Sequence, residues 1–227
     1  LREQGIGIQQ VSMHARKLFK DTPITIFDHT VATTHVKAKK LAKQFYDTRG
    51  SIMIGTSMAL PYITKSVTTT VVTSYEAARA IPTWRAEETL LSLLLSLRDK
   101  TTNQCFVQTR TDPDYILKYA ERGLIDEFYD EEIMMRKALL YPPYAFFILL
   151  TWTGTQSQIL EAEKYIDAQL ISTELHFYNS PMTTSKGITR HGLIRISAEK
   201  WPDPALLEQL RNLPPSIKIE VGPDKII

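Results

Sequence analysis

The sequence has a single cysteine, Cys105, among its 227 residues. A disulfide within the chain and a zinc site built from several cysteines are therefore excluded. Long apolar runs are also missing, since the longest, near residues 145–150, is far shorter than the roughly 20 residues that span a bilayer. Residues 1–18 lack the apolar core of a secretory signal. These absences predict a cytoplasmic protein that does not act at a membrane.

Patterns that bind metals or activate nucleophiles are absent as well. The five histidines show neither HxxxH nor HExxH spacing, so we expect structural or surface roles for them and no metal site. No serine, cysteine or threonine has a plausible base nearby, and no catalytic residue is predicted. Gly5-Ile6-Gly7 lacks the third glycine and the Gly-Lys-Ser/Thr ending of phosphate-binding loops, which favours a turn before a helix.

The composition is that of an ordinary globular protein, because 43% of the residues are hydrophobic and 23% are charged. The length suits two small domains or one large one. Residues 1–112 hold 15 Lys and Arg against 9 Asp and Glu, whereas residues 113–227 hold 12 against 16. The modestly basic first half is compatible with nucleic-acid binding, but an ordinary solvated surface explains it equally well.

Helical and strand patterns alternate in the first half of the chain. Apolar spacing predicts helices over residues 9–19, 34–46 and 83–97, the second capped by Thr33 or Thr34. β-rich runs predict strands over residues 23–28, 51–55, 67–73 and 104–109. Residues 51–55 are nearly all apolar, as expected of a strand buried on both faces. This alternation predicts an α/β lobe with a parallel sheet.

Residues 113–144 are predicted to connect this lobe to the last third. A long helix should run from about 113 to 139, with a break near Gly123. Ile125, Tyr129 and Ile133, with Phe128 beside them, are expected to form one buried stripe. An acidic outer face is expected from Asp126, Glu127, Asp130, Glu131 and Glu132. Pro142 and Pro143 must end the helix.

Residues 145–227 follow a strand-helix-strand-strand-helix-strand pattern. The predicted strands are 145–153, 174–178, 192–197 and 217–221, and the predicted helices are 157–170 and 204–213. This order indicates a ferredoxin-like α+β domain. Its loop of turn formers, residues 181–189, adjoins a candidate phosphate-contact cluster made of Lys186, Arg190, His191 and Arg195.

Two further polar features have competing explanations. Gly55-Thr56-Ser57-Met58 directly follows a predicted strand, and ligands of open α/β sheets bind at the carboxyl ends of strands. A plain turn explains this loop equally well. Lys37, Lys39, Lys40 and Lys43 could contact phosphate, although a solvated helix face is the simpler interpretation.

Residues 128–144, FYDEEIMMRKALLYPPY, resemble the FY-x-x-E-x-x-x-R-x-x-x-x-YPP-aromatic signature of primosomal replication-restart helicases of the PriA type, a superfamily 2 DNA helicase family. The matching residues are Phe128, Tyr129, Glu132, Arg136, Tyr141, Pro142, Pro143 and Tyr144. Residues 54–58 resemble the start of helicase motif V, residues 81–88 the family's Pro-Asp-Phe-Arg-Ala-x-Glu segment, residues 106–109 its Ile-Ile-Gln-Thr strand, and residues 219–223 its terminal Ile-Asp-Val-Asp-Pro.

The resemblance implies a second RecA-like helicase lobe over residues 1–112, a connecting helix and join over 113–144, and a C-terminal domain similar to ribosomal protein S10 over 145–227. It implies ATP as cofactor, only together with a first helicase lobe, and branched or single-stranded DNA, single-stranded-DNA-binding protein and primosome proteins as partners. Zinc is expected in the family but not in this chain. The candidate cofactor-binding residues are Gly55, Thr56, Met58, Arg85, Arg98 and Lys100. Lys186, Arg190, His191 and Arg195 are the candidate DNA contacts.

Several departures concern the ATPase machinery. Motif VI of the family falls on residues 96–103, where both of its glycines and both of its arginines are lost. Such arginines stabilise charge on the transferring phosphate and are worth about 10³–10⁵ in rate. Lys100 keeps a charge without the bidentate fork, and Arg98 is two positions away. The chain also has no Walker A lysine and no acidic motif II.

Three hypotheses follow, and they leave open whether the protein is an enzyme. The first is a replication-restart protein that binds branched DNA and has impaired ATPase chemistry. The second is a protein-interaction scaffold of the replication machinery without DNA binding. The third is an active ATP-dependent 3'-5' helicase, if an intact first lobe precedes these residues.

Overall fold

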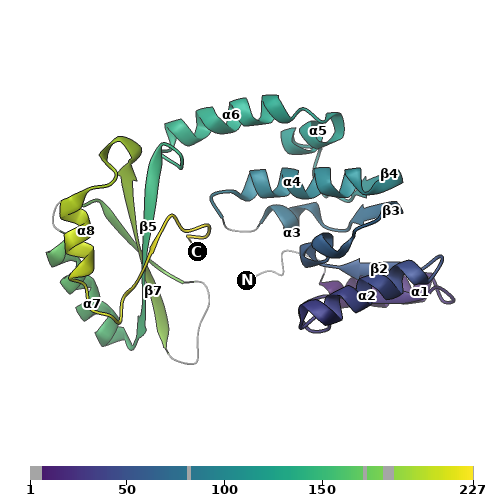
Figure 1. Ribbon diagram of the computed structural model, residues 1–227, viewed down its shortest axis with the longest axis horizontal. Coiled ribbons are helices and arrows are strands. Elements are labelled where there is room, and N and C mark those ends of the chain that lie inside the picture. The colour runs from purple at the N-terminus through teal and green to yellow at the C-terminus, as the bar shows by residue number, and fades with distance from the viewer. Residues whose placement is uncertain (1–6, 81–82, 171–172, 181–186, 227) are drawn as a thin grey trace. The chain divides into compact units, whose positions relative to one another are not determined.

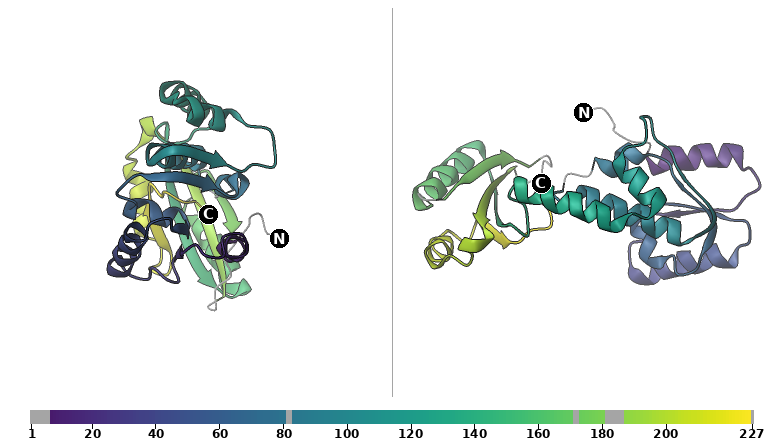
Figure 2. Two further views of the ribbon diagram at one scale, coloured as in Figure 1. Left: turned by 90° about the vertical axis from the view of Figure 1, so that its right-hand side faces the viewer. Right: turned by 90° about the horizontal axis from the view of Figure 1, so that it is seen from above.

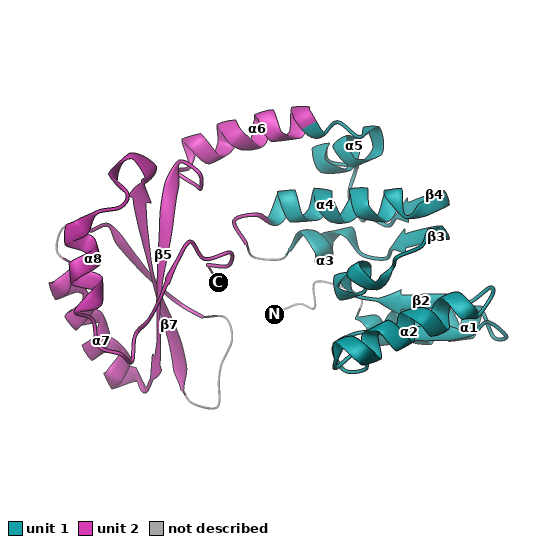
Figure 3. Cartoon of the chain, viewed as in Figure 1, with its two compact units in different colours: residues 1–81, 86–125 teal, residues 82–85, 126–227 magenta. Residues whose placement is uncertain are grey.

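The computed structural model describes residues 7–80, 83–170, 173–180 and 187–226 (Figure 1). The chain divides into two units (Figure 3). Unit 1 contains Leu1–Ile81 and Ala86–Ile125, and unit 2 contains Pro82–Arg85 and Asp126–Ile227. The short Pro82–Arg85 segment therefore belongs with the last third of the chain, although it precedes much of unit 1 in sequence.

Unit 1 alternates helices and strands, as the sequence predicts. Its elements are α1 (Ile8–Leu18), β1 (Ile24–Phe27), α2 (His35–Asp47), β2 (Ile52–Gly55), the 3-10 helix η1 (Ser57–Tyr62), β3 (Val67–Val72), α3 (Tyr75–Arg79), α4 (Ala86–Asp99), β4 (Thr101–Val107) and α5 (Tyr115–Arg122). The pairs β1–β2 and β3–β4 are both parallel. The sequence did not predict α3, which begins where the Ser74 side chain accepts a hydrogen bond from Ala77 N.

The β1–β2 pair is covered by helices on both faces, with α1 on one side and α2 on the other (Figure 2). The core under α2 is built from Phe27 and small residues such as Ala38, Ala42 and Ala59, which let the helix approach the strands closely. Thr34 caps α2, because its side chain accepts a hydrogen bond from Lys37 N at 3.3 Å.

The expectation that residues 51–55 are buried on both faces is wrong. Only Ile54 of β2 is buried. The physical reason is the width of the sheet, since β2 pairs with β1 alone in the described residues. A strand with one neighbour leaves an open edge, whereas the fully apolar pattern is typical of central strands.

The predicted break near Gly123 is confirmed. Gly123 has φ of 73° in the left-handed region and ends α5. The helix α6 (Ile125–Ala138) then follows. Beyond it, the peptide bond between Pro142 and Pro143 is cis.

The predicted buried stripe of α6 is confirmed at Phe128 and wrong at its other three members. Ile125, Tyr129 and Ile133 are 44%, 42% and 45% exposed, and the residues that the helix buries are Phe128, Glu132 and Arg136. The acidic outer face is wrong at one member, because Glu132 is buried. The cause is an ion pair between Glu132 and Arg136, which lie one helical turn apart. Because the two charges compensate each other, both side chains can be buried, although hydropathy alone predicts that they are exposed.

Unit 2 contains one four-stranded antiparallel sheet with strand order β6-β7-β5-β8. Besides α6, its elements are β5 (Ala145–Gly154), α7 (Gln156–Gln169), β6 (Leu175–Asn179), β7 (Ile188–Ser197), the 3-10 helix η2 (Ala198–Lys200), α8 (Pro204–Arg211) and β8 (Lys218–Val221). The predicted strand-helix-strand-strand-helix-strand order is thus confirmed, with β7 beginning four residues before the predicted start at 192.

Alternation along β5 gives the sheet two different faces. Ile148, Leu150 and Trp152 belong to the large core that α7 and α8 complete on one face (Figure 1). Phe147 belongs to a smaller cluster with Ala145 and Leu193, which Trp84, Tyr141, Tyr178 and Ile226 cover. The second face is therefore closed by segments from distant parts of the sequence rather than by a helix.

Candidate functional site

A groove of about 320 Å³ lies at the start of β5 in unit 2. Three stretches of sequence form it, and its lining residues are Trp84, Arg85, Pro142, Pro143, Ala145, Phe146, Phe147, Gly222, Pro223 and Asp224. Two of the three stretches include residues of the Tyr-Pro-Pro-Tyr join and of the Ile-Glu-Val-Gly-Pro ending. The sequence positions with the clearest resemblance to a family thus meet in one place.

Trp84 is the centre of this site. Its indole Nε1 donates a hydrogen bond of 3.0 Å to the Pro223 carbonyl oxygen. The indole meets Phe147 edge to face, with ring centroids 6.1 Å apart. The Arg136 guanidinium lies 5.0 Å from the centre of the indole ring, within the range of a cation–π contact.

Glu132 fixes Arg136 in this position. Its Oε1 accepts a hydrogen bond of 2.7 Å from Arg136 Nε and lies 2.7 Å from Nη2 of the same guanidinium in an ion pair. The two side chains are only 3% and 10% exposed, so removing either one would leave a charge buried without its partner. The Glu-x-x-x-Arg spacing of the join therefore serves here to hold the Trp84 indole.

The neighbours of Trp84 secure the same segment at the surface. Thr83 Oγ1 donates a 3.0 Å hydrogen bond to the Asp224 carbonyl oxygen. The Arg85 guanidinium lies 4.9 Å from the centre of the Trp84 ring and 3.5 Å from Asp224 Oδ1. The Asp224 side chain is largely exposed, so this ion pair contributes little, and the indole carries most of the attachment.

The groove offers packing surfaces rather than catalytic groups. Its only carboxylate, Asp224, is exposed and paired with Arg85. Within the described ranges, no group of three or more His, Cys, Asp and Glu side chains is placed to hold a metal ion. No described helix is both long and apolar enough to cross a bilayer. The arrangement is suited to holding the three chain segments together or to binding a partner on its apolar surface.

Three of the candidate cofactor-binding residues, Gly55, Thr56 and Met58, shape the end of β2. A Cβ at Gly55 would come within 2.8 Å of the Phe27 carbonyl oxygen, so the close approach of β1 requires glycine here. Thr56 N donates to the same oxygen at 3.3 Å. Met58 packs against the core under α2.

Arg98 and Lys100 both donate to main-chain carbonyls within unit 1. Arg98 Nη1 donates at 2.8 Å to Ala120 O, near the carboxyl end of α5. Lys100 Nζ donates at 2.6 Å to Ile63 O, directly after η1. Each cation thereby satisfies an otherwise open carbonyl near a helix end. The sixth candidate, Arg85, belongs to unit 2 and makes the contacts given above.

The structure separates the candidate DNA contacts. Lys186 lies outside the described residues. Arg190 points towards α7, where it pairs with Glu163, and its Nη1 donates to Asn179 Oδ1 at 2.9 Å. The next residue, His191, points to the opposite face, as alternation along a strand requires.

His191 and Arg195 are built into that opposite face. His191 is buried, its Nδ1 is 3.0 Å from Thr151 Oγ1, and desolvation lowers the pKa of its imidazole. The Arg195 guanidinium lies 5.5 Å and 5.6 Å from the ring centres of Tyr141 and Phe147. In the described structure its buried Nε has no hydrogen-bond partner. Arg190, His191 and Arg195 therefore do not share one surface.

The comparisons with known proteins give one consistent result. No protein-family model matches the chain. The chain is 26% identical over 144 residues to the replication restart protein PriA of Borreliella burgdorferi. The aligned residues are 61% of this chain and 22% of that protein. The protein of the same name from Chlamydia trachomatis is 27% identical over 191 residues, 82% of this chain and 25% of that protein. The protein of that name from Bacillus subtilis is 25% identical over 157 residues, which are 66% of this chain and 20% of that protein. The chain thus spans a quarter or less of the length of these curated relatives.

Proposed function

We propose that this chain, which is a divergent PriA-like protein, acts in replication restart by binding branched DNA with impaired ATPase chemistry. The observation that carries the proposal is the extent of the similarity. A match over 191 residues is longer than either unit, so it includes parts of both. A single shared motif would not produce this.

The proposal extends to the fold of each unit. A second RecA-like helicase lobe is our proposal for unit 1, and the parallel pairing of β1 with β2 and of β3 with β4, in two two-stranded sheets of the described residues, supports it. Unit 2 has the strand order β6-β7-β5-β8 with α7 and α8 on one face, as in ferredoxin-like domains, of which the S10-like domain is an example. On this proposal residues 1–112 and 145–227 are the two domains and residues 113–144 connect them, in a cytoplasmic protein.

Impaired ATPase chemistry is supported by the contacts of the two cations within residues 96–103, where motif VI of the family falls. Arg98 and Lys100 donate to Ala120 O and Ile63 O, so part of the hydrogen-bonding capacity of each cation is engaged within unit 1. The residues present do not fit the phosphate-stabilising role, and we assign this chain no step of ATP hydrolysis. ATP would enter only with a first helicase lobe, and no zinc is assigned to these residues.

For DNA binding we propose Lys186 and Arg190 as phosphate contacts. Arg190 lies at the β6–β7 side of the sheet, where it shares its guanidinium between Glu163 and Asn179. His191 and Arg195 would act by shaping the sheet beside it. Single-stranded-DNA-binding protein and primosome proteins are the partners that this function implies.

The test is binding of the 227-residue chain to fluorescent forked, single-stranded and duplex oligonucleotides over a range of salt concentrations. We expect preference for the fork and a dissociation constant that rises steeply with salt, because phosphate contacts release counterions. Absence of binding even at low salt would refute DNA binding and support the scaffold hypothesis. Unwinding of the fork by a longer protein with ATP would refute impaired ATPase chemistry and support the helicase hypothesis.

A further inference from the structure

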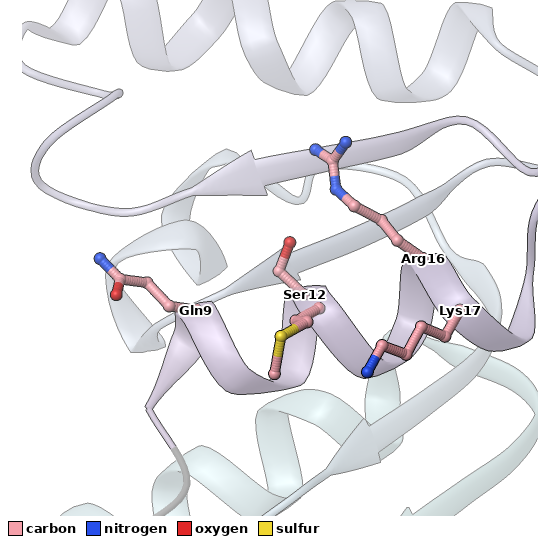
Figure 4. Close-up of a pocket in the computed structure, with 5 residues that line it drawn as sticks. Gln9, Ser12, Arg16 and Lys17 are labelled. Atoms are coloured by element: carbon pink, nitrogen blue, oxygen red, sulfur yellow. The ribbon is translucent and has the colours of Figure 1, made fainter.

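The hollow along α1, of about 480 Å³, is an open surface rather than a binding pocket. Its lining residues all project from this one helix, and they are Gln9, Ser12, Met13, Arg16 and Lys17 (Figure 4). Ligand pockets bury most of a ligand and direct a few polar groups at it, which the face of a single helix does not do. The edge of the sheet in unit 2 differs, because the sheet fixes the direction of every backbone polar group there.

β8 forms one edge of this antiparallel sheet. In the described residues it pairs with β5 alone. Lys218, Glu220 and Val221 are exposed, and Val221 retains 48% of its accessible surface. An edge strand presents backbone N–H and C=O groups that its own sheet does not pair. The open side of β8 is therefore a surface on which a further strand can pair.

A single backbone hydrogen bond shows which residues of β8 face the open side. Gly222 N donates to Phe147 O at 2.8 Å, in continuation of the register between β5 and β8. Bonded pairs alternate with unbonded pairs in an antiparallel ladder, so every second residue back from Gly222 bonds to β5. The residues between them, Ile219 and Val221, therefore direct their N–H and C=O groups to the open side. Outside the ladder with β5, neither residue forms a backbone hydrogen bond in the described structure.

The hydrogen bonds on the other side of β5 agree with this assignment. Ala198 N donates to Tyr144 O at 3.0 Å, in continuation of the register between β5 and β7. β5 thus directs its even-numbered residues to β7 and its odd-numbered residues, such as Phe147, to β8. A strand with two neighbours must alternate in this way. The direction of the backbone groups of β8 therefore follows from two separate observations.

β8 also carries one charge of each sign on the same face. Lys218 and Glu220 are two residues apart and form a 3.0 Å ion pair, with side chains 72% and 46% exposed. Ile219, between them, points to the other face and packs against the core under α7 and α8. A lysine on an edge strand normally opposes pairing of two copies, because the like charges meet. The glutamate two residues further on removes this obstacle in one register.

That register is an antiparallel pair of two β8 strands centred on Ile219. The outward N–H and C=O of Ile219 then meet the same groups of the second copy, and both hydrogen bonds are exchanged. Lys218 lies opposite Glu220 of the second copy, and Glu220 opposite Lys218, in unbonded pairs whose Cα atoms are about 4.5 Å apart. Registers centred on Lys218 or on Glu220 would instead place like charges opposite each other. A register centred on Val221 leaves both charges without an opposite partner.

We propose that β8 of one copy of this chain pairs with β8 of a second copy, centred on Ile219, and joins the two four-stranded sheets into one. The occupant is a second copy because the charge order from Lys218 to Glu220 is complementary to itself when one strand is reversed. The contact uses the same strand on both copies, so it closes as a two-fold dimer. It is confined to one strand of unit 2, and unit 1 takes no part in it. So short a contact makes a weak, transient dimer.

Sedimentation velocity of the 227-residue chain from about 10 µM to about 1 mM, a range that covers weak interfaces, tests the proposal. We expect a concentration-dependent dimer that weakens as salt is raised. Lys218→Glu places glutamates opposite each other twice, and Glu220→Lys does the same with lysines. Each single reversal should therefore raise the dissociation constant about tenfold. Circular dichroism establishes that each variant is folded.

The double variant Lys218→Glu/Glu220→Lys is the decisive arm. It exchanges the two charges and again places opposite signs across the strand pair, so dimerisation should return to that of the unaltered chain. An equimolar mixture of the two single reversals should also dimerise, for the same reason. Lys40→Glu on α2 and Glu208→Lys on α8 are matched single reversals at other exposed positions, and they should dimerise like the unaltered chain.

Three results would overturn the proposal. A chain that is monomeric at every concentration would mean that the edge accepts a strand of another protein or is kept single by its charges. A dimer that neither single reversal weakens would lie elsewhere on the chain. A dimer that the reversals weaken and the double variant does not restore would exclude the register centred on Ile219. A dimer this weak is dissociated at the nanomolar concentrations of a DNA-binding assay, so failure to bind DNA would leave the result unaffected.

Discussion

The guanidinium of Arg136 lies 5.0 Å from the centre of the Trp84 indole ring, and Glu132 holds it there with two 2.7 Å contacts. This relationship gives the signature stretch of residues 128–144 a physical role in this chain. Its glutamate and arginine together form one side of the seat for the segment that joins α3 to α4, that is, of the surface on which this segment packs. The other side of the seat is the Pro223 carbonyl and the Phe147 ring.

Replacing Trp84 tests how much this seat contributes to unit 2. Trp84→Ala removes the contacts with Phe147 and Arg136 and should lower the free energy of unfolding by about 2–4 kcal/mol, towards the lower part of the range for aromatic truncation because the indole is half-buried. Trp84→Phe keeps a ring and loses the hydrogen bond to Pro223, for about 1 kcal/mol. Urea unfolding followed by circular dichroism measures both. Equal stability of the alanine variant and the unaltered chain would show that the seat is not a stabilising contact.

The Glu132–Arg136 pair should behave as a buried charge pair. Glu132→Met or Arg136→Met alone leaves one buried charge unpaired and should cost about 3–5 kcal/mol. The double variant Glu132→Met/Arg136→Met should cost clearly less than the sum of the two single changes, because no uncompensated charge remains. Denaturant unfolding of the four proteins completes the cycle. Additive costs would mean that the two side chains act independently.

The sequence predicted the order of helices and strands well, because local spacing controls it. The strands of unit 2 alternate, and Gly123 and Thr34 end and cap helices by short-range rules. The prediction of a buried stripe on α6 is wrong at Ile125, Tyr129 and Ile133 for a different reason. Hydropathy ranks Ile125, Tyr129 and Ile133 above Glu132 and Arg136, but burial is decided by the Trp84 segment, which is 50 residues away in sequence. The four-residue spacing of Glu132 and Arg136 was the one local sign of a pair.

The same limit explains the basic residues. Lys186, Arg190, His191 and Arg195 are neighbours in sequence, and proximity along the chain suggested one surface. Strand alternation instead sends Arg190 to Glu163 on α7 and buries His191 against Thr151. A partner such as Glu163 cannot be assigned from sequence before the helix and strand are placed on each other.

His191 should make stability depend on pH. Burial lowers the pKa of its imidazole below the ordinary value of 6.5, so below about pH 6.5 the unfolded chain binds a proton that the folded chain does not. Its contribution to stability is therefore complete above that pH and is lost as pH falls through the folded pKa. Melting temperatures from pH 5 to 8 should fall less steeply on the acid side for His191→Gln than for the unaltered chain. His176→Gln, at an exposed position, serves as the control, and identical pH profiles for all three proteins would contradict the prediction.

Removing the two proposed phosphate contacts should weaken fork binding without unfolding the protein. Each phosphate contact adds about 0.9 to the slope of log affinity against log salt concentration on duplex DNA, so Lys186→Ala/Arg190→Ala should reduce the slope by nearly two and weaken binding at low salt. Arg211→Ala/Lys218→Ala removes the same charge from exposed positions on α8 and on β8, the edge strand farthest from β6, and should change the slope little.

Arg190→Ala also leaves Glu163 without its cation, so Glu163→Gln is needed beside it to separate lost attraction from a newly exposed negative charge. Fluorescence anisotropy at four or more salt concentrations gives the slopes. An unchanged slope in the Lys186/Arg190 variant would remove both residues as phosphate contacts and direct attention to the exposed lysines of α2.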